Sequence, residues 1–291
     1  MKISKEHVVF SMNPKNKPVA TCKNGETIVF ECLDCFSNQL KTNHDTLDGI
    51  DMDHINPATG PVYVLGAQPG DALCITIRKI EIPEVGTIIA EPNFGRLGHK
   101  ITEAQTNRVK IYDNKLIDFE GHILPLKKMV GVIGTAPRDE AVSTGTPGDH
   151  GGNLDTIHIT EGSKVYLPVN VEGGLLAMGD CHASMGDGEI IGAGLEIPAN
   201  VTVTVEILRD FKLPLPIVET EQSWMTLASA ETMETASDKA IENMLEIIRR
   251  TSDLDLNQAA MLLSLAGNLR VSQIVNPHVT MRMELAKTAL K

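Results

Sequence analysis

The sequence has 291 residues, of which 42% are hydrophobic, and a formal net charge of −12. This composition supplies a substantial core. The negative charge is spread along the chain and only 3% of residues are aromatic, so the cationic surface and stacking platforms of nucleic-acid-binding proteins are absent. No apolar stretch approaches the roughly 20 residues that cross a bilayer, and the N-terminus lacks a secretory pattern. We therefore expect a cytoplasmic protein with neither a membrane nor a nucleic-acid partner.

Short apolar–polar alternations dominate residues 1–212. Residues 201–207 alternate valine or isoleucine with threonine or glutamate, which is the period of a half-buried strand. A similar alternation over 73–82 changes phase at Arg78 and Lys79, which predicts a β-bulge. Glycine- and proline-rich turns separate these runs, so the sequence predicts a β-sandwich or barrel as the catalytic body.

The period changes after residue 212, where the stiff segment LPLP cannot continue a strand. Apolar residues at helical spacing predict an amphipathic helix over Ser237–Arg250. A second helix is expected over Leu256–Ala266, with Asp255 and Gln258 forming its N-terminal cap and Gly267 ending it.

These signals divide the chain into three parts. Residues 213–270 form a helical α/β insert, and residues 271–291 contain a final strand that returns to the β-rich body of residues 1–212. The predicted fold class is therefore mainly β, with a smaller α/β C-terminal part.

Five cysteines in a chain without an export signal indicate reduced thiols. Cys32 and Cys35 form a C-x-x-C pair, but a strand running into a loop is not the usual setting of a redox motif, and a second pair for a zinc site is missing. We interpret them as buried small apolar residues.

Acids, histidines and glycines are concentrated between residues 147 and 196. Such side chains bind a divalent metal or move protons, and the glycines allow tight turns near a ligand. A calcium-stabilised or merely polar loop is the alternative interpretation.

Motifs in this segment resemble the acetamidase/formamidase family of amide hydrolases. The resemblance is carried by GNLD at 152–155, LPV at 167–169, GDCHASMGDGE at 179–189 and Glu196, with upstream matches in 34–39 and 56–71. It implies a jelly-roll-like β-sandwich with a smaller α/β part, and hydrolysis of short linear amides such as formamide or acetamide to ammonia and a carboxylate.

Amide hydrolysis requires an activated water or nucleophile, a polarised carbonyl and a proton for the leaving nitrogen. Asp180 and His182 are two residues apart on an expected strand, so both can reach one ion. Glu189, expected to begin the next strand, is the predicted general base or third ligand. The predicted cofactor is zinc, with calcium as the oxygen-rich alternative.

The remaining assignments complete the predicted site. Asp34, Asp180, His182 and Glu189 are the expected metal ligands; the expected catalytic residues are Asn153, Asp155, His182, Asp187 and Glu189, and the expected substrate-binding residues are Asp34, Asn38, Gln39 and His150. His44 and Asp45 lie in an acidic loop that is a further candidate for metal binding. A solvated loop that binds no metal is the simpler interpretation.

Two other functions stay open at this point. One is a covalent amidase using Cys181 or Ser184, and the other is a non-enzymatic metal-dependent or carbohydrate-binding β-sandwich module. The apolar β-segments, whose edges need covering, and the resemblance together predict at least a homodimer.

Overall fold

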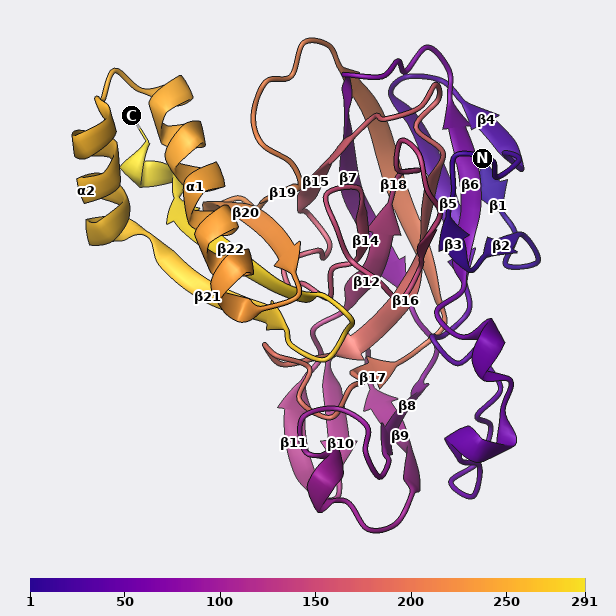
Figure 1. Ribbon diagram of the computed structural model, residues 1–291. Coiled ribbons are helices and arrows are strands. Elements are labelled where there is room, and N and C mark those ends of the chain that lie inside the picture. The colour runs from indigo at the N-terminus through magenta and orange to yellow at the C-terminus, as the bar shows by residue number, and fades with distance from the viewer. Residues whose placement is uncertain (291) are drawn as a thin grey trace.

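Two large β-sheets carry most of the chain, which the computed structural model describes over residues 1–290. Figure 1 shows the two sheets in the body of the molecule, two helices to one side and a small lobe of strands below. The mainly β fold with a smaller α/β part is therefore confirmed.

The first sheet has nine strands, and every neighbouring pair is antiparallel except the first. In spatial order they are β1 (Lys2–Ile3), β5 (Glu26–Cys32), β18 (Ala199–Leu208), β7 (Ala72–Glu81), β15 (Lys164–Pro168), β19 (Ile217–Glu219), β20 (Ser223–Ala230), β22 (Val279–Ala286) and β21 (Asn268–Gln273).

The second sheet has eleven strands. Its main path is β11 (His122–Pro125), β10 (Leu116–Phe119), β9 (Gln105–Tyr112), β8 (Val85–Ala90), β17 (Leu195–Glu196), β16 (Leu176–Ser184), β12 (Met129–Gly134) and β14 (Gly151–Asn153). The strand β6 (Ala58–Val64) branches from β16 and pairs with β2 (Val8–Val9) and β4 (Ala20–Cys22).

Shorter elements complete the described chain. A two-stranded sheet joins β3 (Ser11–Met12) to β13 (Val142–Ser143). The 3-10 helices are η1 (Leu47–Gly49), η2 (Met52–His54), η3 (Gly98–Lys100) and η4 (Lys287–Ala289).

The main core lies between the two sheets. Phe30 on β5, Ile75 on β7 and Val203 on β18 belong to the same buried cluster as Val130 on β12 and Met178 on β16. Because alternate side chains of a strand point to opposite faces, each strand leaves its other face free for solvent, for covering loops or for a site.

The predicted strand patterns around residues 73–82 and 201–207 are confirmed as β7 and β18. The register between them shifts where Lys79 pairs with Thr202 but Ile77 pairs with Val203, so the predicted bulge is present.

Both predicted helices are confirmed. Helix α1 (Met233–Thr251) begins after the N-cap Thr232, and helix α2 (Leu256–Ala266) has a complete capping box between Asp255 and Gln258. Helix α1 packs on β20 and β22 through a second apolar cluster that includes Met244 and Leu285.

The C-terminal part contains more strand than the sequence suggested. Strands β20 and β21 flank the helices, and the predicted final strand β22 pairs with both of them. The nine-stranded sheet is continuous through this part, and the division at residues 212 and 270 stays a prediction. No helix among residues 1–290 has the length and apolarity needed to cross a membrane.

Candidate active site

Strand β16 supplies two residues of the site from the face opposite the main core. Its thiol-bearing residue Cys181 belongs to the core cluster, so the flanking Asp180 and His182 point the other way. Glu196 on β17 pairs with His182, and its Oε1 lies 3.2 Å from His182 Nε2.

The loop after β14 places Asp155 against the same histidine. Asp155 Oδ1 lies 3.9 Å from His182 Nε2, and Asp180 Oδ1 lies 3.4 Å from the same nitrogen. Gly131 on β12 makes room for both carboxylates, because a Cβ there would stand 2.3 Å from Asp155 Oδ1 and 2.9 Å from Asp180 Oδ2.

Glu189 reaches the site from the loop between β16 and β17. It does not begin a strand, as the sequence analysis expected; the next strand begins only at Leu195. The backbone N–H of Gly188 donates to Ser272 O at 2.8 Å, and Gly188 forms a bridge with Gln273. The C-terminal hairpin of β21 and β22 therefore fixes the conformation of this loop. The hairpin lies far from the loop in the sequence, so local patterns do not predict this contact.

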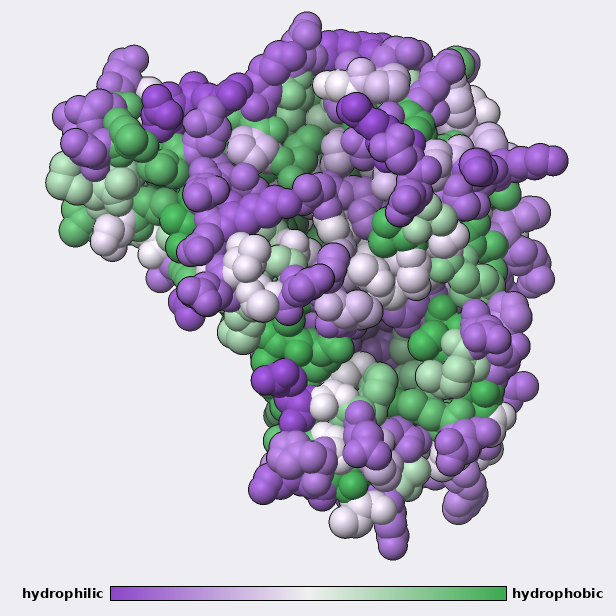
Figure 2. Space-filling view, in the orientation of Figure 1, coloured by the Kyte–Doolittle hydropathy of each residue, from purple (hydrophilic) through white to green (hydrophobic). Residues whose placement is uncertain are grey.

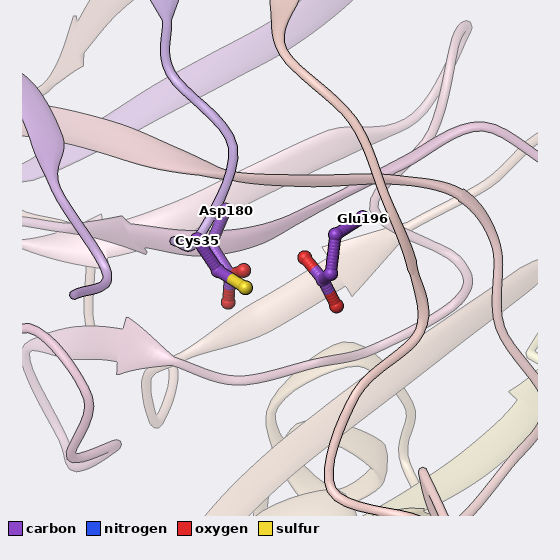
Figure 3. Close-up of side chains that lie close together, drawn as sticks. All are labelled: Cys35, Asp180 and Glu196. Carbon is purple, nitrogen blue, oxygen red and sulfur yellow. The ribbon is translucent and has the colours of Figure 1, made fainter. Parts of the chain in front are cut away.

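The side chains form two adjoining groups with metal-ligand chemistry. In the first, ligand atoms of Asp155, His182 and Glu189 lie within 4.8 Å of one another. In the second, Cys35 joins Asp180 and Glu196 within the same limit, and Figure 3 shows these three side chains gathered around one space.

Three carboxylates of the site stand on strained backbone. The φ angle is 39° at Asp155, 52° at Asp180 and 50° at Glu189. A non-glycine residue in this region costs on the order of 1–3 kcal/mol, and such residues gather at functional sites. The strain therefore supports a functional role for this cluster.

Burial changes the proton affinities of the cluster. It raises the pKa of Asp155 to about 6, and it raises the pKa of Glu189 and of Glu196 well above the usual range. Burial acts to lower the pKa of His182, but the neighbouring carboxylates, Glu196 first, outweigh it and leave that pKa well above its usual value. Without a cation, several of these groups therefore hold protons near neutral pH, whereas a divalent cation among them favours the ionised carboxylates.

Buried oxygens in the cluster lack hydrogen-bond donors. Asp155 Oδ1, Glu189 Oε2, Glu196 Oε2 and Asn153 Oδ1 are all buried and unpartnered. Unsatisfied buried acceptors are costly, so these oxygens suit a cation or a hydrogen-bonding ligand. An imidazole with carboxylates fits zinc, and the purely oxygen donors also suit calcium.

A cavity of about 270 Å³ opens onto these groups. Its lining includes Cys35, Asn153, Asp180, Glu189 and Glu196, together with Asn276 from the turn between β21 and β22. The cluster is thus buried but faces a space in which a small molecule can bind.

Similarity to known proteins agrees with the motifs read from the sequence. A profile of the acetamidase/formamidase family matches residues 4–145 and 138–288. The chain belongs to this family. It is 45% identical to an acetamidase from Bacillus halodurans, whose crystal structure matches with a TM-score of 0.97 over 99% of this chain and 98% of that one.

Two curated relatives are more distant. A formamidase of Methylophilus methylotrophus is 27% identical over 262 residues, covering 68% of this chain and 63% of the relative. An acetamidase of Mycolicibacterium smegmatis is 25% identical over 267 residues, covering 68% and 65%. This chain therefore spans under two thirds of the length of these curated relatives.

The acetamidase/formamidase motif at 179–189 brings Asp180, His182 and Glu189 together, whereas its Asp187 forms an ion pair with Arg282. The Asp187 carboxylate receives two hydrogen bonds of 2.8 Å from the guanidinium of Arg282 on β22. This ion pair fastens the loop that carries Glu189 to the C-terminal hairpin. A direct catalytic role for Asp187 stays a prediction.

The upstream motif at 34–39 shapes the chain beside the cavity. Asp34 Oδ1 accepts from the backbone of Phe36 and Asn38, and Asn38 Oδ1 accepts from the backbone of Asp34. Gln39 exchanges two hydrogen bonds with the backbone of Asp51. These residues fix a turn and a loop, and their roles as ligands or substrate contacts stay predictions.

His150 is buried outside the cavity lining. Burial lowers the pKa of its imidazole to about 4, so it is neutral near pH 7. In the acidic loop, Asp45 caps the backbone of Lys41 and Thr42 while His44 is exposed, and within the described chain neither joins a group of metal ligands.

Cys35 and Asn276 are cavity residues that the sequence did not predict for the site. Cys35 was interpreted only as a buried apolar residue, and it is indeed buried, but its thiol faces Asp180 and Glu196. Asn276 lies far along the chain in a turn without a recognisable motif. The bridge between Gly188 and Gln273 and the hydrogen bond from Asn276 to Asp155 hold this turn at the site.

Proposed function

We propose that this chain hydrolyses the carbon–nitrogen bond of short linear amides, releasing ammonia and a carboxylate, with a divalent metal bound in the acidic cavity. The observation that carries the proposal is the buried group of Asp155, His182 and Glu189, which has unpartnered carboxylate oxygens and adjoins a cavity through Glu189. Membership of the acetamidase/formamidase family gives the reaction class.

The donor atoms suit the proposed metal. His182 would ligate through Nε2, the nitrogen that faces the carboxylates, with Asp155, Asp180 and Glu196 as the neighbouring oxygen donors. When bound, a divalent ion polarises a carbonyl and lowers the pKa of a nearby water. Zinc is the favoured ion because one donor is an imidazole, and calcium is the alternative.

Glu189 is the proposed general base. Its carboxylate lies next to the possible metal ligands Asp155 and His182. It also faces the cavity, because Glu189 is one of the residues that line it. A base in this position takes a proton from water as the amide is attacked and returns it to the leaving nitrogen. We expect Asn153, whose Oδ1 is unpartnered and which lines the cavity, to accept a hydrogen bond from the substrate N–H.

A covalent mechanism through Cys181 or Ser184 has less support. The Cys181 side chain is fully buried in the sandwich core, and neither residue lines the cavity. The homodimer and the cytoplasmic location expected from the sequence stay predictions, and light scattering giving a particle of 31.5 kDa would contradict the dimer.

Ammonia release from acetamide tests the proposal. Glu189→Gln preserves shape and removes the base, so kcat should fall by a factor on the order of 10² to 10⁴. Cys181→Ala is the matched control in the core and should keep most activity. A dead Cys181→Ala protein of native fold beside an active Glu189→Gln protein would replace this mechanism with the covalent one.

A further inference from the structure

The cavity changes character from its floor to its mouth. The floor residues Asp180, Glu189 and Glu196 are buried, as are Cys35 and Asn153. The residues nearer solvent include an apolar set that is half-buried or exposed: Leu47, Met52, Ile55, Phe94, Val275 and Pro277. Figure 2 shows that this face of the molecule is hollowed and bordered by apolar surface.

This apolar wall is assembled from distant segments. Leu47 and Met52 come from η1 and η2, Phe94 from the loop after β8, and Val275 from the turn after β21. Leu47 and Phe94 also pack on the small cluster around Phe36 and Leu40, which gives the wall support from behind. Several segments therefore contribute to this apolar wall, which does not consist of a single exposed side chain.

The cavity is larger than formamide or acetamide requires. A water molecule occupies about 30 Å³ in the liquid, so the cavity of about 270 Å³ has room for roughly nine atoms of that size. The amide group supplies three non-hydrogen atoms and the attacking water a fourth. The proposed metal ion takes about one more position. Roughly four positions remain, of which acetamide fills one and formamide none.

The polar floor determines the orientation of a substrate. The amide group must lie at the floor, where Glu189 and the unpartnered Asn153 Oδ1 are found. The acyl chain then points to the mouth and meets Leu47, Met52 and Phe94. A charged acyl group would lose hydration against these three side chains.

We propose that the preferred substrates are primary amides with an apolar acyl group of about three to five carbon atoms beyond the carbonyl carbon. This inference rests on the proposed amidase function. Burial of each methylene group raises transition-state binding roughly fourfold. Butyramide, with two more methylenes than acetamide, should therefore be hydrolysed with a kcat/KM on the order of tenfold higher.

The test compares kcat/KM for acetamide, butyramide and hexanamide, measured as ammonia release by the 291-residue chain. A rise from acetamide to butyramide supports the proposal. A value that stays level or falls along this series overturns it while leaving the amidase function intact. Release of ammonia from none of the amides would instead refute the amidase function itself.

Variants of the wall locate the effect. Met52→Gln keeps the length of an exposed side chain but makes it polar, and Leu47→Asn does the same at a half-buried position. Each should lower the ratio of butyramide to acetamide kcat/KM severalfold, and acetamide turnover serves as the reference for a folded protein. Leu265→Gln is the control, because Leu265 is 87% exposed on α2 and outside the cavity lining. Equal ratios in the wall variants and the control would contradict the inference.

Discussion

The side-chain amide of Asn276 donates a hydrogen bond of 2.8 Å to Oδ2 of Asp155, joining residues 121 positions apart in the sequence. The turn that holds Asn276 is fixed by the buried Gln273, whose Oε1 accepts from the backbone of Val275 and Asn276. Asp155 therefore presents Oδ1, its unpartnered oxygen, towards His182. The C-terminal hairpin thus orients a carboxylate of the site.

Removal of this donor should weaken the site without dismantling the fold. Asn276→Ala frees Asp155 to rotate, and loss of a residue that orients a ligand typically costs 10- to 100-fold in metal affinity or activity. We expect a fall of that size in kcat/KM for acetamide and in zinc affinity measured by titration. Asn243→Ala on α1 is the control and should match the wild type; an Asn276→Ala protein indistinguishable from it would show that the hydrogen bond has no such role.

Gly131 tests whether the close approach of the two carboxylates is needed. A Cβ at this position would meet Asp155 Oδ1 at 2.3 Å, so Gly131→Ala should displace Asp155 or Asp180 and reduce amidase activity at least about 100-fold. Gly49→Ala adds the same methyl group where nothing lies within 4 Å, and activity should persist. Wild-type activity in Gly131→Ala would mean that the cluster tolerates a displaced carboxylate and would count against this geometry.

The local structure could be predicted where local signals determine it. Asp255, Gln258 and the apolar spacing defined α2 from neighbouring residues alone, and the phase change at Lys79 revealed the bulge. Asp180 and His182 were expected on one face because they share a strand. Cys35 and Asn276 could not be found in this way, because only the stacking of loops from distant segments brings them to the cavity.

The ion pair between Arg282 and Asp187 should show an asymmetric response to mutation. Arg282 is 2% exposed, whereas the Asp187 side chain is 37% exposed. Asp187→Asn leaves a buried guanidinium without a counter-charge, while Arg282→Met leaves a carboxylate that can turn to water. We expect the free energy of unfolding, from urea titration, to fall by about 2–4 kcal/mol in Asp187→Asn and by a smaller amount in Arg282→Met. The reverse order would contradict the structural role assigned to this pair.

Stability of the metal-free protein should decline as the pH rises from about 4 to 6. The pKa of Asp155 is raised from its ordinary value of 3.8, which applies to the unfolded chain, to about 6 in the folded protein. This carboxyl therefore stabilises the folded state at pH values below 3.8, and the stabilisation is lost as the pH rises through about 6. The raised pKa of His182 acts in the same direction at higher pH. Thermal melts in the presence of chelator should show the decline, and Asp155→Asn should make it shallower between pH 4 and 6. Part of the decline remains, because burial also raises the pKa of Asp34 to about 6. Identical slopes for both proteins would exclude Asp155 as its source.

Metal dependence of ammonia release from acetamide is the most direct test of the proposed function. The 291-residue chain is assayed as purified, after exhaustive chelation and after addition of zinc or calcium, with circular dichroism confirming the fold at each step. Because Asp155, Glu189 and Glu196 hold unpartnered carboxylate oxygens beside His182, we predict that chelation abolishes release and that one of the two ions restores it. Full activity in a chelated protein shown to be metal-free would contradict the metal-assisted mechanism.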